Sequence, residues 1–274
     1  MIKFNSEYKI GFIGVGNMAS AMISGMTGVG LYPWSNIYLF DISEDKTARF
    51  AEQGAIAVGS VKELYDNCNC IVLSVKPQTF PSILAELKAC KNDKRVLYIS
   101  IGAGISTDSI STALDGAPVV RALPNTPMLI GKGVSAICRN DRVTDSEFEF
   151  SCSIFESAGS VLKINENEMN RIICVTSSSP AYVFMFIKAI CDAATEQGLD
   201  GQAALSSVCD MVSGAAELLK TSGKTADELI SMVCSKGGTT ERAVAELKRL
   251  SVPEAIASAM QKCTDRADEL GQIK

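Results

Sequence analysis

The chain has 274 residues, of which 47% are hydrophobic and 21% charged, and its formal net charge is −5. This balance is typical of a globular protein with one or two domains and excludes an intrinsically disordered chain. The negative charge argues against nucleic acids or anionic membranes as general partners. The absence of histidine excludes Ser-His-Asp hydrolysis, histidine general bases and histidine-ligated zinc.

No uninterrupted apolar run approaches the ~20 residues that cross a bilayer, so we expect no membrane contact. Residues 1–10 lack a basic segment followed by an apolar one, so we expect no secretory signal. Ten cysteines are scattered without a C-x-x-C pair, and most stand among apolar residues. This usage indicates reduced, buried thiols in a cytoplasmic protein and favours neither a disulfide framework nor a metal site.

The first part of the chain alternates strand-like and helix-like segments. Several strand candidates are continuous apolar runs, as in a parallel sheet with both faces covered. The expected strands are Lys9–Ile13, Ile37–Phe40, Ile71–Val75, Val96–Ser100, Val119–Leu123, Val134–Cys138 and Val161–Ile164. The expected early helices are Ala19–Gly28, Glu44–Gln53 and Pro81–Lys88. This alternation predicts an α/β fold, a doubly wound Rossmann sheet with right-handed crossovers.

From about residue 166 the pattern changes to helical periodicity with almost no strand signal. One long helical segment runs from Glu168 towards Gly198, and the later ones are Gly201–Gly223, Ala226–Val233, Thr239–Leu250 and Pro253–Leu270. Glycines separate these segments, as helix ends require. We therefore expect an α/β domain over residues 1–165 and a helical domain over 166–274. Small residues on the helices allow close packing, either over the first domain or against a second copy of the chain.

The strongest local motif is Gly14–Ala19 (GVGNMA), which follows an apolar strand and opens a helix. A G-x-G-x-x-A turn in this context is typical of dinucleotide binding. Gly14 makes the tight turn, Gly16 lets the backbone approach a pyrophosphate, and the helix N-terminus faces the anion. The expected cofactor contacts at this turn are Ile13, Gly14, Gly16, Asn17 and Met18. An ordinary glycine-rich turn is the alternative.

Asp41 ends the second expected strand, about 20 residues after the glycine-rich turn. An acidic residue there binds the ribose 2′-hydroxyl of NAD and repels the 2′-phosphate of NADP. No arginine follows at once, and Lys46 is the nearest cation. Asp41 therefore favours NADH slightly over NADPH, while a helix cap near Ser43 is the alternative use of this residue.

Three further turns follow expected parallel strands, at the edge where such sheets bind ligands. They supply the remaining expected cofactor contacts, which are Val75, Lys76, Pro77, Gly102, Ala103 and Asn125. Lys76 either approaches the cofactor or substrate or faces solvent. The glycine-alanine pair is small enough for a nicotinamide to lie close to the backbone. Asn125 stands between two prolines in a rigid turn, so its amide is a candidate for ribose or substrate contacts.

A second chemical site is the segment Ser235–Thr240, where a glycine pair precedes an expected helix. Backbone N–H groups at that helix start suit a carboxylate, and Thr240 adds a hydroxyl donor. A plain N-cap by Thr239 is the alternative, and the two uses are compatible. The expected substrate-binding residues are Ser235, Gly237, Gly238, Thr239 and Thr240.

Together these motifs resemble those of the pyrroline-5-carboxylate reductases. The segments that carry the resemblance are Gly11–Met18, Val75–Pro77, Arg121–Pro127, Ser177–Phe184 and Gly237–Thr240, which span nearly the whole chain in the family's order. The first segment is shared with other dehydrogenases. The Ser-Ser-Pro-Ala-Tyr and Gly-Gly-Thr-Thr segments, at this separation, are much more specific.

The resemblance implies a dinucleotide-binding Rossmann domain and a helical dimerisation and substrate domain, with homodimers that commonly assemble further, often into decamers. It implies hydride transfer from NAD(P)H to the C=N carbon of Δ1-pyrroline-5-carboxylate, giving L-proline. It also implies that Ser235–Thr240 holds the substrate carboxylate and that Thr240, the expected catalytic residue, hydrogen-bonds the ring nitrogen. No metal is implied. This chemistry suits a chain without histidine, because the cofactor supplies the hydride.

Three features depart from the family pattern. Lys236 stands where proline is usual, and Glu241 and Arg242 follow the threonines where an apolar residue is common. Asp41 replaces the Ser, Thr or Arg of NADPH-preferring members. Substrate detail and cofactor preference therefore stay open. Among rival functions, a β-hydroxyacid dehydrogenase or imine reductase shares the opening motif, but Lys188 lacks the paired asparagines of the hydroxyacid enzymes. A non-catalytic nucleotide sensor is disfavoured by the intact Gly-Gly-Thr-Thr loop.

Overall fold

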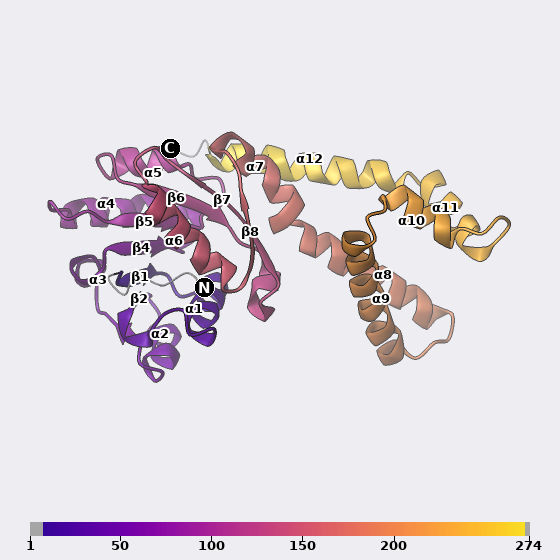
Figure 1. The fold of residues 1–274 in the computed structure, drawn as a ribbon, viewed down its shortest axis with the longest axis horizontal. Coiled ribbons are helices and arrows are strands. Elements are labelled where there is room, and N and C mark those ends of the chain that lie inside the picture. Colours follow the sequence, from indigo (N-terminus) through magenta and orange to yellow (C-terminus); the bar gives the residue numbers. More distant parts are fainter. Residues whose placement is uncertain (1–7, 272–274) are drawn as a thin grey trace. The chain divides into compact units, whose positions relative to one another are not determined.

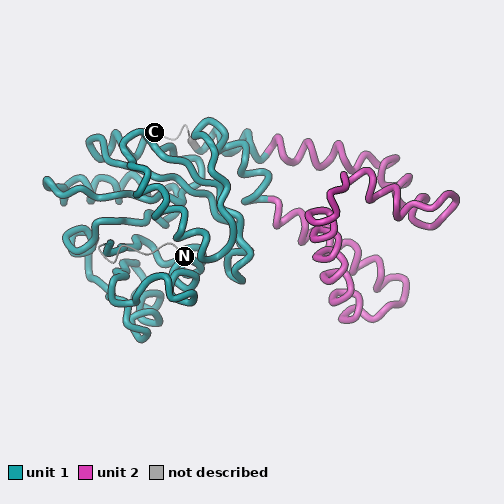
Figure 2. The backbone as a smooth tube through the Cα atoms, viewed as in Figure 1, with its two compact units in different colours: residues 1–178, 263–274 teal, residues 179–262 magenta. Residues whose placement is uncertain are grey.

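The structure is a computed structural model that describes residues 8–271, so most of the segment in which no secretory signal is expected lies outside it. The chain forms two compact units, coloured separately in Figure 2. The first comprises Met1–Ser178 with Cys263–Lys274, and the second comprises Ser179–Lys262. The first unit contains the sheet, and the second is helical.

Among the described residues, the first unit holds an eight-stranded sheet in the order β3-β2-β1-β4-β5-β6-β7-β8 (Figure 1). The strands are β1 (Ile10–Ile13), β2 (Ile37–Phe40), β3 (Ile56–Ala57), β4 (Cys70–Leu73), β5 (Leu97–Ser100), β6 (Val119–Leu123), β7 (Gly133–Arg139) and β8 (Gly159–Lys163). Pairing is parallel from β3 through β6. The first six strands follow the Rossmann order, so the doubly wound prediction is confirmed.

One pairing departs from the parallel pattern, because β7 runs antiparallel to β6. The connection between them, residues 124–132, holds only the 3₁₀-helix η3 (Thr126–Ile130). A parallel crossover needs a dozen or more residues, so a connection this short can only reverse the chain. The helix α6 (Asp145–Glu156) then provides a crossover, and β8 pairs in parallel with β7.

Helices cover both faces of the sheet. The expected early helices are confirmed as α1 (Asn17–Gly28), α2 (Glu44–Ala51) and α4 (Phe80–Cys90). Phe12 of β1 packs on one face with Met22 and Phe155, while Ile13 packs on the other with Leu64. Both faces of β1 are therefore buried, which explains its continuous apolar sequence.

The sequence reading missed β3 and the helices α3 (Val61–Asn67), α5 (Thr107–Ala113) and α6. The strand has two residues and the first two helices have seven each, too short for a periodic pattern. The longer α6 begins with a capping box, in which Thr144 accepts from the N–H of Glu147 and the Glu147 carboxylate accepts from the N–H of Thr144. That Thr-x-x-Glu pattern is the signal that identifies its start.

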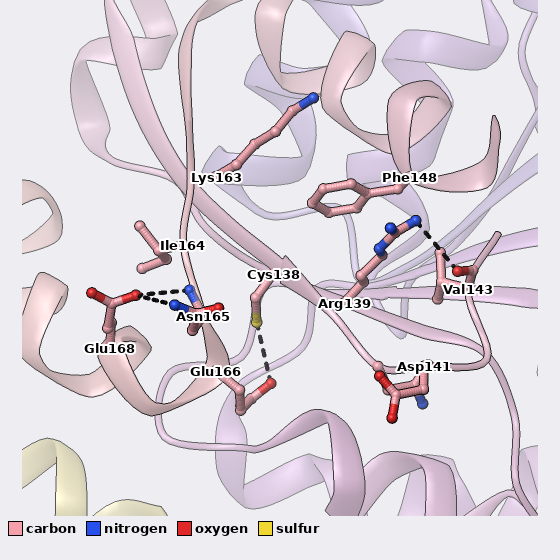
Figure 3. A pocket seen from close by; sticks show the side chains of 11 residues that line it. Cys138, Arg139, Asp141, Val143, Phe148, Lys163, Ile164, Asn165, Glu166 and Glu168 are labelled. Atoms are coloured by element: carbon pink, nitrogen blue, oxygen red, sulfur yellow. Dashed lines mark hydrogen bonds between the residues drawn. The ribbon is translucent and has the colours of Figure 1, made fainter. Parts of the chain in front are cut away.

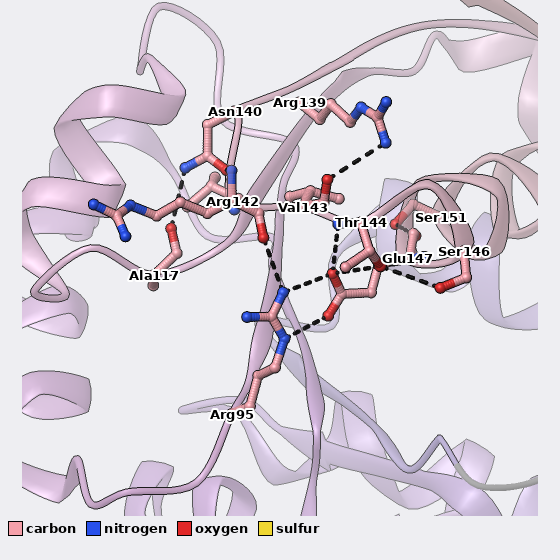
Figure 4. A network of polar contacts seen from close by, with 11 residues as sticks. Arg95, Ala117, Arg139, Asn140, Arg142, Val143, Thr144, Ser146, Glu147 and Ser151 are labelled. Atoms are coloured by element: carbon pink, nitrogen blue, oxygen red, sulfur yellow. Dashed lines mark hydrogen bonds and ion pairs between the residues drawn. The ribbon is translucent and has the colours of Figure 1, made fainter.

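The Glu147 carboxylate also anchors α6 to the segment that leads into β5 (Figure 4). Its two oxygens accept from the Arg95 guanidinium at 2.9 and 2.8 Å, and the Glu147 side chain is buried. Burial alone would raise the pKa of Glu147. Hydrogen bonds from Arg95 and Thr144, together with the Arg95 charge, outweigh burial and hold that pKa below its usual value.

The second unit contains α8 (Ser179–Glu196), α9 (Gly201–Thr221), α10 (Ala226–Val233), α11 (Thr239–Arg249) and most of α12 (Val252–Gly271). This confirms the helical prediction for the C-terminal part. The first long segment is not one regular helix. It begins as α7 (Met169–Ile172) and passes through a π-helical turn over Ile173–Ser177, where the N–H of Ser178 donates to the carbonyl of Ile173.

Many large apolar side chains of the helical unit are exposed in the single chain, including Phe184 at 61% and Met185 at 70%. Measured by mean hydropathy rather than as an uninterrupted run, the helical stretch Glu166–Glu196 is long and apolar enough to cross a membrane. Mean hydropathy is a different criterion from an uninterrupted apolar run, so the expectation of no membrane contact stays a prediction. A single stretch of this kind is weak evidence for a membrane, and exposed apolar faces equally mark protein interfaces.

Candidate active site

The carboxyl ends of neighbouring parallel strands meet at one edge of the sheet. Ile13 is in register with Phe40 and Leu73, and Leu73 is in register with Ser100. The turns after these residues are therefore neighbours, and this edge is where open α/β sheets bind ligands. The predicted cofactor contacts brought together there are Ile13, Gly14, Gly16, Asn17, Met18, Asp41, Val75, Lys76, Pro77, Gly102 and Ala103.

The two glycines of the first turn have different reasons to be glycine. Gly14 has φ +92°, and a Cβ there would lie 2.8 Å from the carbonyl oxygen of Ser74. Gly16 has φ −82°, and a Cβ there would meet no atom within 4 Å. The fold therefore requires glycine at 14 but leaves open space at 16. Open space at the uncapped start of α1, with no acidic residue in its first turn, fits a dinucleotide pyrophosphate.

Asp41 joins the end of β2 to the glycine-rich turn. Its carboxylate, only 6% exposed, accepts from the N–H of Val15 at 2.7 Å and of Ser43 at 2.9 Å. The Lys46 ammonium lies 3.2 Å from Asp41 Oδ1. Burial alone would raise the pKa of Asp41, but these two N–H groups and Lys46 outweigh it and lower that pKa. Because α2 begins at Glu44 with Ser43 as its N-cap, Asp41 is not the helix cap.

The turns after β4 and β5 differ in how far packing explains their sequence. Lys76 is exposed after β4, and Pro77 opens the 3₁₀-helix η2 (Pro77–Thr79). A Cβ on Gly102 would lie 2.6 Å from the Phe80 ring, so packing requires glycine there. Ala103 beside it is half-buried. Their contacts with a cofactor stay predictions.

Asn125 lies after β6 and is buried, with both ends of its side-chain amide occupied. Its Oδ1 accepts from the N–H of Val134 at 2.8 Å, and its Nδ2 donates to the carbonyl of Thr176 at 2.9 Å. In a regular α-helix that carbonyl accepts from residue 180, but Pro180 has no N–H. Asn125 supplies the missing donor, and its contact with a ligand stays a prediction.

The predicted substrate loop, Ser235–Thr240, belongs to the second unit. The N–H of Gly238 donates to the carbonyl of Ser235 at 2.9 Å, and Gly237 has φ +75°. α11 begins at Thr239 with Gly238 as its N-cap, so the alternative that Thr239 is the cap is wrong. The N–H of Gly237 donates to a carboxylate oxygen of Glu241 at 2.6 Å. The loop therefore already presents a backbone donor to a carboxylate.

Two residues at the sheet edge were not singled out from the sequence. The Ser74 hydroxyl donates to the carbonyl of Gly14 at 2.6 Å and so holds the glycine-rich turn against β4. The side chain of Ile42, directly after Asp41, is 96% exposed. An apolar residue beside the acidic one at a strand end is the only sequence signal for it. An exposed apolar side chain at this edge suits the flat face of a nucleobase.

A separate cavity of about 650 Å³ lies at the opposite edge of the sheet, where the antiparallel strand β7 ends (Figure 3). Arg139 and Lys163 flank the Phe148 ring at 4.8 and 5.5 Å from its centroid, and each forms a 2.6 Å ion pair with an acidic side chain. The Cys138 thiol donates to Glu166, and burial raises its pKa. Within the described residues, none of the predicted site residues lines this cavity.

A Rossmann sheet with an open glycine-rich turn and an ionised aspartate at its second strand defines a dinucleotide-binding oxidoreductase. Residues 166–270 match the family model for pyrroline-5-carboxylate reductase dimerisation, and residues 9–104 match that for NADP oxidoreductase, coenzyme F420-dependent. The chain is 35% identical over 268 residues to the pyrroline-5-carboxylate reductase of Escherichia coli K12, covering 97% of this chain and 99% of that protein. The chain belongs to the pyrroline-5-carboxylate reductase family.

Solved structures agree with this assignment over nearly the whole chain. The Plasmodium falciparum pyrroline carboxylate reductase with NADP bound has a TM-score of 0.90 and 27% identity, covering 97% of this chain and 99% of its own. The enzyme from Streptococcus pyogenes has a TM-score of 0.87 and 31% identity, covering 96% and 98%. The resemblance seen in the motifs is therefore confirmed at the level of family and fold.

Proposed function

We propose that the chain reduces Δ1-pyrroline-5-carboxylate to L-proline with NAD(P)H, the last step of proline biosynthesis. The observation that carries this proposal is the 35% sequence identity, over 268 residues, with the pyrroline-5-carboxylate reductase of Escherichia coli. The open space at Gly16 supports it. When bound, NAD(P)H supplies the hydride that the imine carbon receives. The chain's own residues bind and orient the two molecules and exclude water.

The dinucleotide is held by the turns at the carboxyl edge of the sheet. The N–H groups at the start of α1 receive the pyrophosphate over Gly16, and Asp41 receives the adenosine ribose. The residues around Lys76, Gly102 and Asn125 flank the nicotinamide half. A slight preference for NADH is supported by the Asp41 carboxylate, which its hydrogen bonds keep ionised. In dinucleotide-binding folds an acid at this position accepts the 2′-hydroxyl of NAD.

The loop Ser235–Thr240 binds the substrate carboxylate. Support comes from the N–H of Gly237, which donates to the Glu241 carboxylate. This backbone group is therefore oriented to bind a carboxylate. Thr240, half-buried in the first turn of α11, forms a hydrogen bond with the ring nitrogen through its hydroxyl and orients the imine. The imine takes its proton from solvent, so Thr240 positions the substrate rather than acting as a strong acid.

Residues 1–165 form the dinucleotide-binding domain, and residues 166–274 form the dimerisation and substrate domain. Exposed apolar side chains on α8, such as Phe184 and Met185, support a homodimer that covers them, with further assembly, for example into a decamer. The same partner copy explains the hydropathy of the α8 region without a membrane. The ten cysteines of the described residues form no disulfide, which supports a reducing, cytoplasmic location.

The test is the oxidation of NADH or NADPH, at matched concentrations, by purified protein with pyrroline-5-carboxylate, followed by absorbance and by proline formation. We expect proline with both cofactors and faster turnover with NADH. Faster turnover with NADPH would keep the reaction and contradict the proposed preference. Folded protein that binds a dinucleotide but forms no proline would contradict the proposed substrate.

The alternative of a β-hydroxyacid dehydrogenase is disfavoured, because Lys188 forms an ion pair with Asp192 along α8.

A further inference from the structure

The acidic residue at the ribose end of the proposed site is not a bare negative charge. Both oxygens of Asp41 are occupied, since Oδ2 accepts from the N–H of Val15 and Oδ1 from that of Ser43. The Lys46 ammonium lies 3.2 Å from Oδ1 and 3.4 Å from Oδ2. Asp41 and Lys46 therefore form a neutral pair, in which the carboxylate also holds the glycine-rich turn.

The two members of this pair differ in how freely they can move. The Asp41 side chain is 6% exposed, whereas that of Lys46 is 49% exposed. Asp41 cannot leave without breaking two backbone hydrogen bonds. In the part of the chain that the structure describes, the Asp41 carboxylate is the one polar group that the Lys46 ammonium contacts. Its long flexible stem can therefore carry the ammonium to a second anion nearby.

Among the described residues of α2, the other charged side chains offer no competing cation. Glu44 and Asp45 occupy the first turn of α2 beside Lys46 and are exposed. The Arg49 guanidinium donates to the Ser20 hydroxyl and stacks 4.6 Å from the Phe50 ring centroid. Lys46 is therefore the cation available to an anion that arrives beside Asp41.

We propose that Lys46 is the specificity-determining residue through which this site accepts the 2′-phosphate of NADPH, and that its sharing with Asp41 sets how strongly NADPH is disfavoured. The inference rests on the proposed dinucleotide site. With NADH the Asp41–Lys46 pair stays intact beside the 2′-hydroxyl. With NADPH the ammonium bridges the carboxylate and the phosphate, which reduces the repulsion between two anions.

The test measures equilibrium binding, not turnover, by calorimetric titration of 2′,5′-ADP and 5′-ADP and of NADPH and NADH. Lys46→Met is expected to weaken binding of 2′,5′-ADP and NADPH, the two probes that carry a 2′-phosphate, at least about tenfold, which corresponds to about 1.4 kcal/mol. Binding of 5′-ADP and NADH is expected to change less than about twofold. Lys46→Arg keeps the charge and is expected to retain NADPH binding.

A matched control removes an equivalent charge far from this edge. Lys88→Met breaks the exposed ion pair with Asp115, at the end of α4, and is expected to change neither class of probe. Asp41→Asn releases Lys46 at the cost of one of the two backbone hydrogen bonds, and it is expected to raise the ratio of NADPH to NADH affinity at least about tenfold. That gain is expected to vanish in the Asp41→Asn, Lys46→Met double variant, because it passes through the ammonium.

Two results would overturn the proposal. One is that Lys46→Met weakens 5′-ADP and 2′,5′-ADP equally, which would make Lys46 a support of the turn only. The other is that it leaves NADPH binding unchanged. Failure of all four probes to bind the wild-type chain is a different result, because it would remove the proposed dinucleotide site itself. Thermal melting of each variant establishes that binding is measured on folded protein.

Discussion

One added methyl group at each of the two glycines of the first turn distinguishes a residue that the fold requires from one that cofactor binding requires. Gly14→Ala forces alanine into φ +92°, which costs about 1–2 kcal/mol, and sets its Cβ against the backbone oxygen of Ser74. Backbone there cannot swing aside as a side-chain tip can. We expect Gly14→Ala to lower the free energy of unfolding by about 2–4 kcal/mol.

Gly16→Ala is expected to behave in the opposite way. Its φ of −82° suits alanine, and the added Cβ meets no atom of the chain within 4 Å. Alanine gains about 0.5–1 kcal/mol from lower unfolded-state entropy and loses a similar amount as a poorer N-cap. Stability should stay within about 1 kcal/mol of wild type. The Cβ fills space that the pyrophosphate requires, and losing one charged hydrogen bond, worth about 1.5–3 kcal/mol, weakens binding about 10- to 100-fold.

Urea unfolding measures the stabilities, and calorimetric titration with NADH measures the affinities on the same preparations. The reasoning requires Gly14→Ala to lose stability and Gly16→Ala to lose affinity without losing stability. Wild-type affinity in Gly16→Ala would refute the placement of the pyrophosphate over residue 16. A large loss of stability in Gly16→Ala would refute the claim that the fold leaves that space open.

Three further predictions concern catalysis, pH and assembly. Thr240→Val should lower turnover about 10- to 100-fold, from the loss of one hydrogen bond to the substrate, with NADH affinity unchanged and Thr240→Ser restoring most of the rate in the proline-forming assay. The pKa of Glu147 is lowered in the folded chain, so the stabilisation that its carboxylate provides is complete above the unfolded pKa and is lost as pH falls through the folded pKa. Urea titrations should therefore find Glu147→Gln about 1–3 kcal/mol less stable than wild type at pH 7 and nearly equal to it in acid. Phe184→Asp combined with Met185→Asp should weaken self-association at least about 100-fold in sedimentation velocity, while the melting of the first unit is kept.

The fold was predictable where burial leaves a mark on the sequence. β2 has the predicted bounds, because strands covered on both faces need unbroken apolar runs. β6 also has its predicted bounds, although Arg121 interrupts its apolar run. α10 also has its predicted bounds, because Thr225 begins a capping box. The reversal between β6 and β7 was not predicted, although the short connection between them contained the information. Short elements such as α3 and α5 carry too few residues for any period to emerge.

The candidate site was predictable where the backbone imposes a residue type and not where distant side chains meet. Gly14 was found because a tight turn with positive φ requires glycine. The bond from Val15 to Asp41 joins two loops 26 residues apart, and no local pattern encodes it. The pairing of Asp41 with Lys46 depends on the direction in which α2 follows β2. An acidic residue at a strand end, considered without its partner, therefore predicts a stronger preference for NADH than the Asp41–Lys46 pair supports.

Asn125 shows how a motif that looks like ligand chemistry also answers a structural need. Two segments that carry the family resemblance, Arg121–Pro127 and Ser177–Phe184, are tied together by its bond to Thr176, one residue before the second segment. Pro180 leaves that carbonyl without its helical partner, and the carbonyl, which lies within the π-helical turn, accepts from Asn125 instead. The proline and the asparagine thus act as one unit, because Asn125 supplies the donor that Pro180 lacks. The amide of Asn125 fixes the chain at the point where the sheet-containing unit leads into the long helix that carries the exposed apolar face.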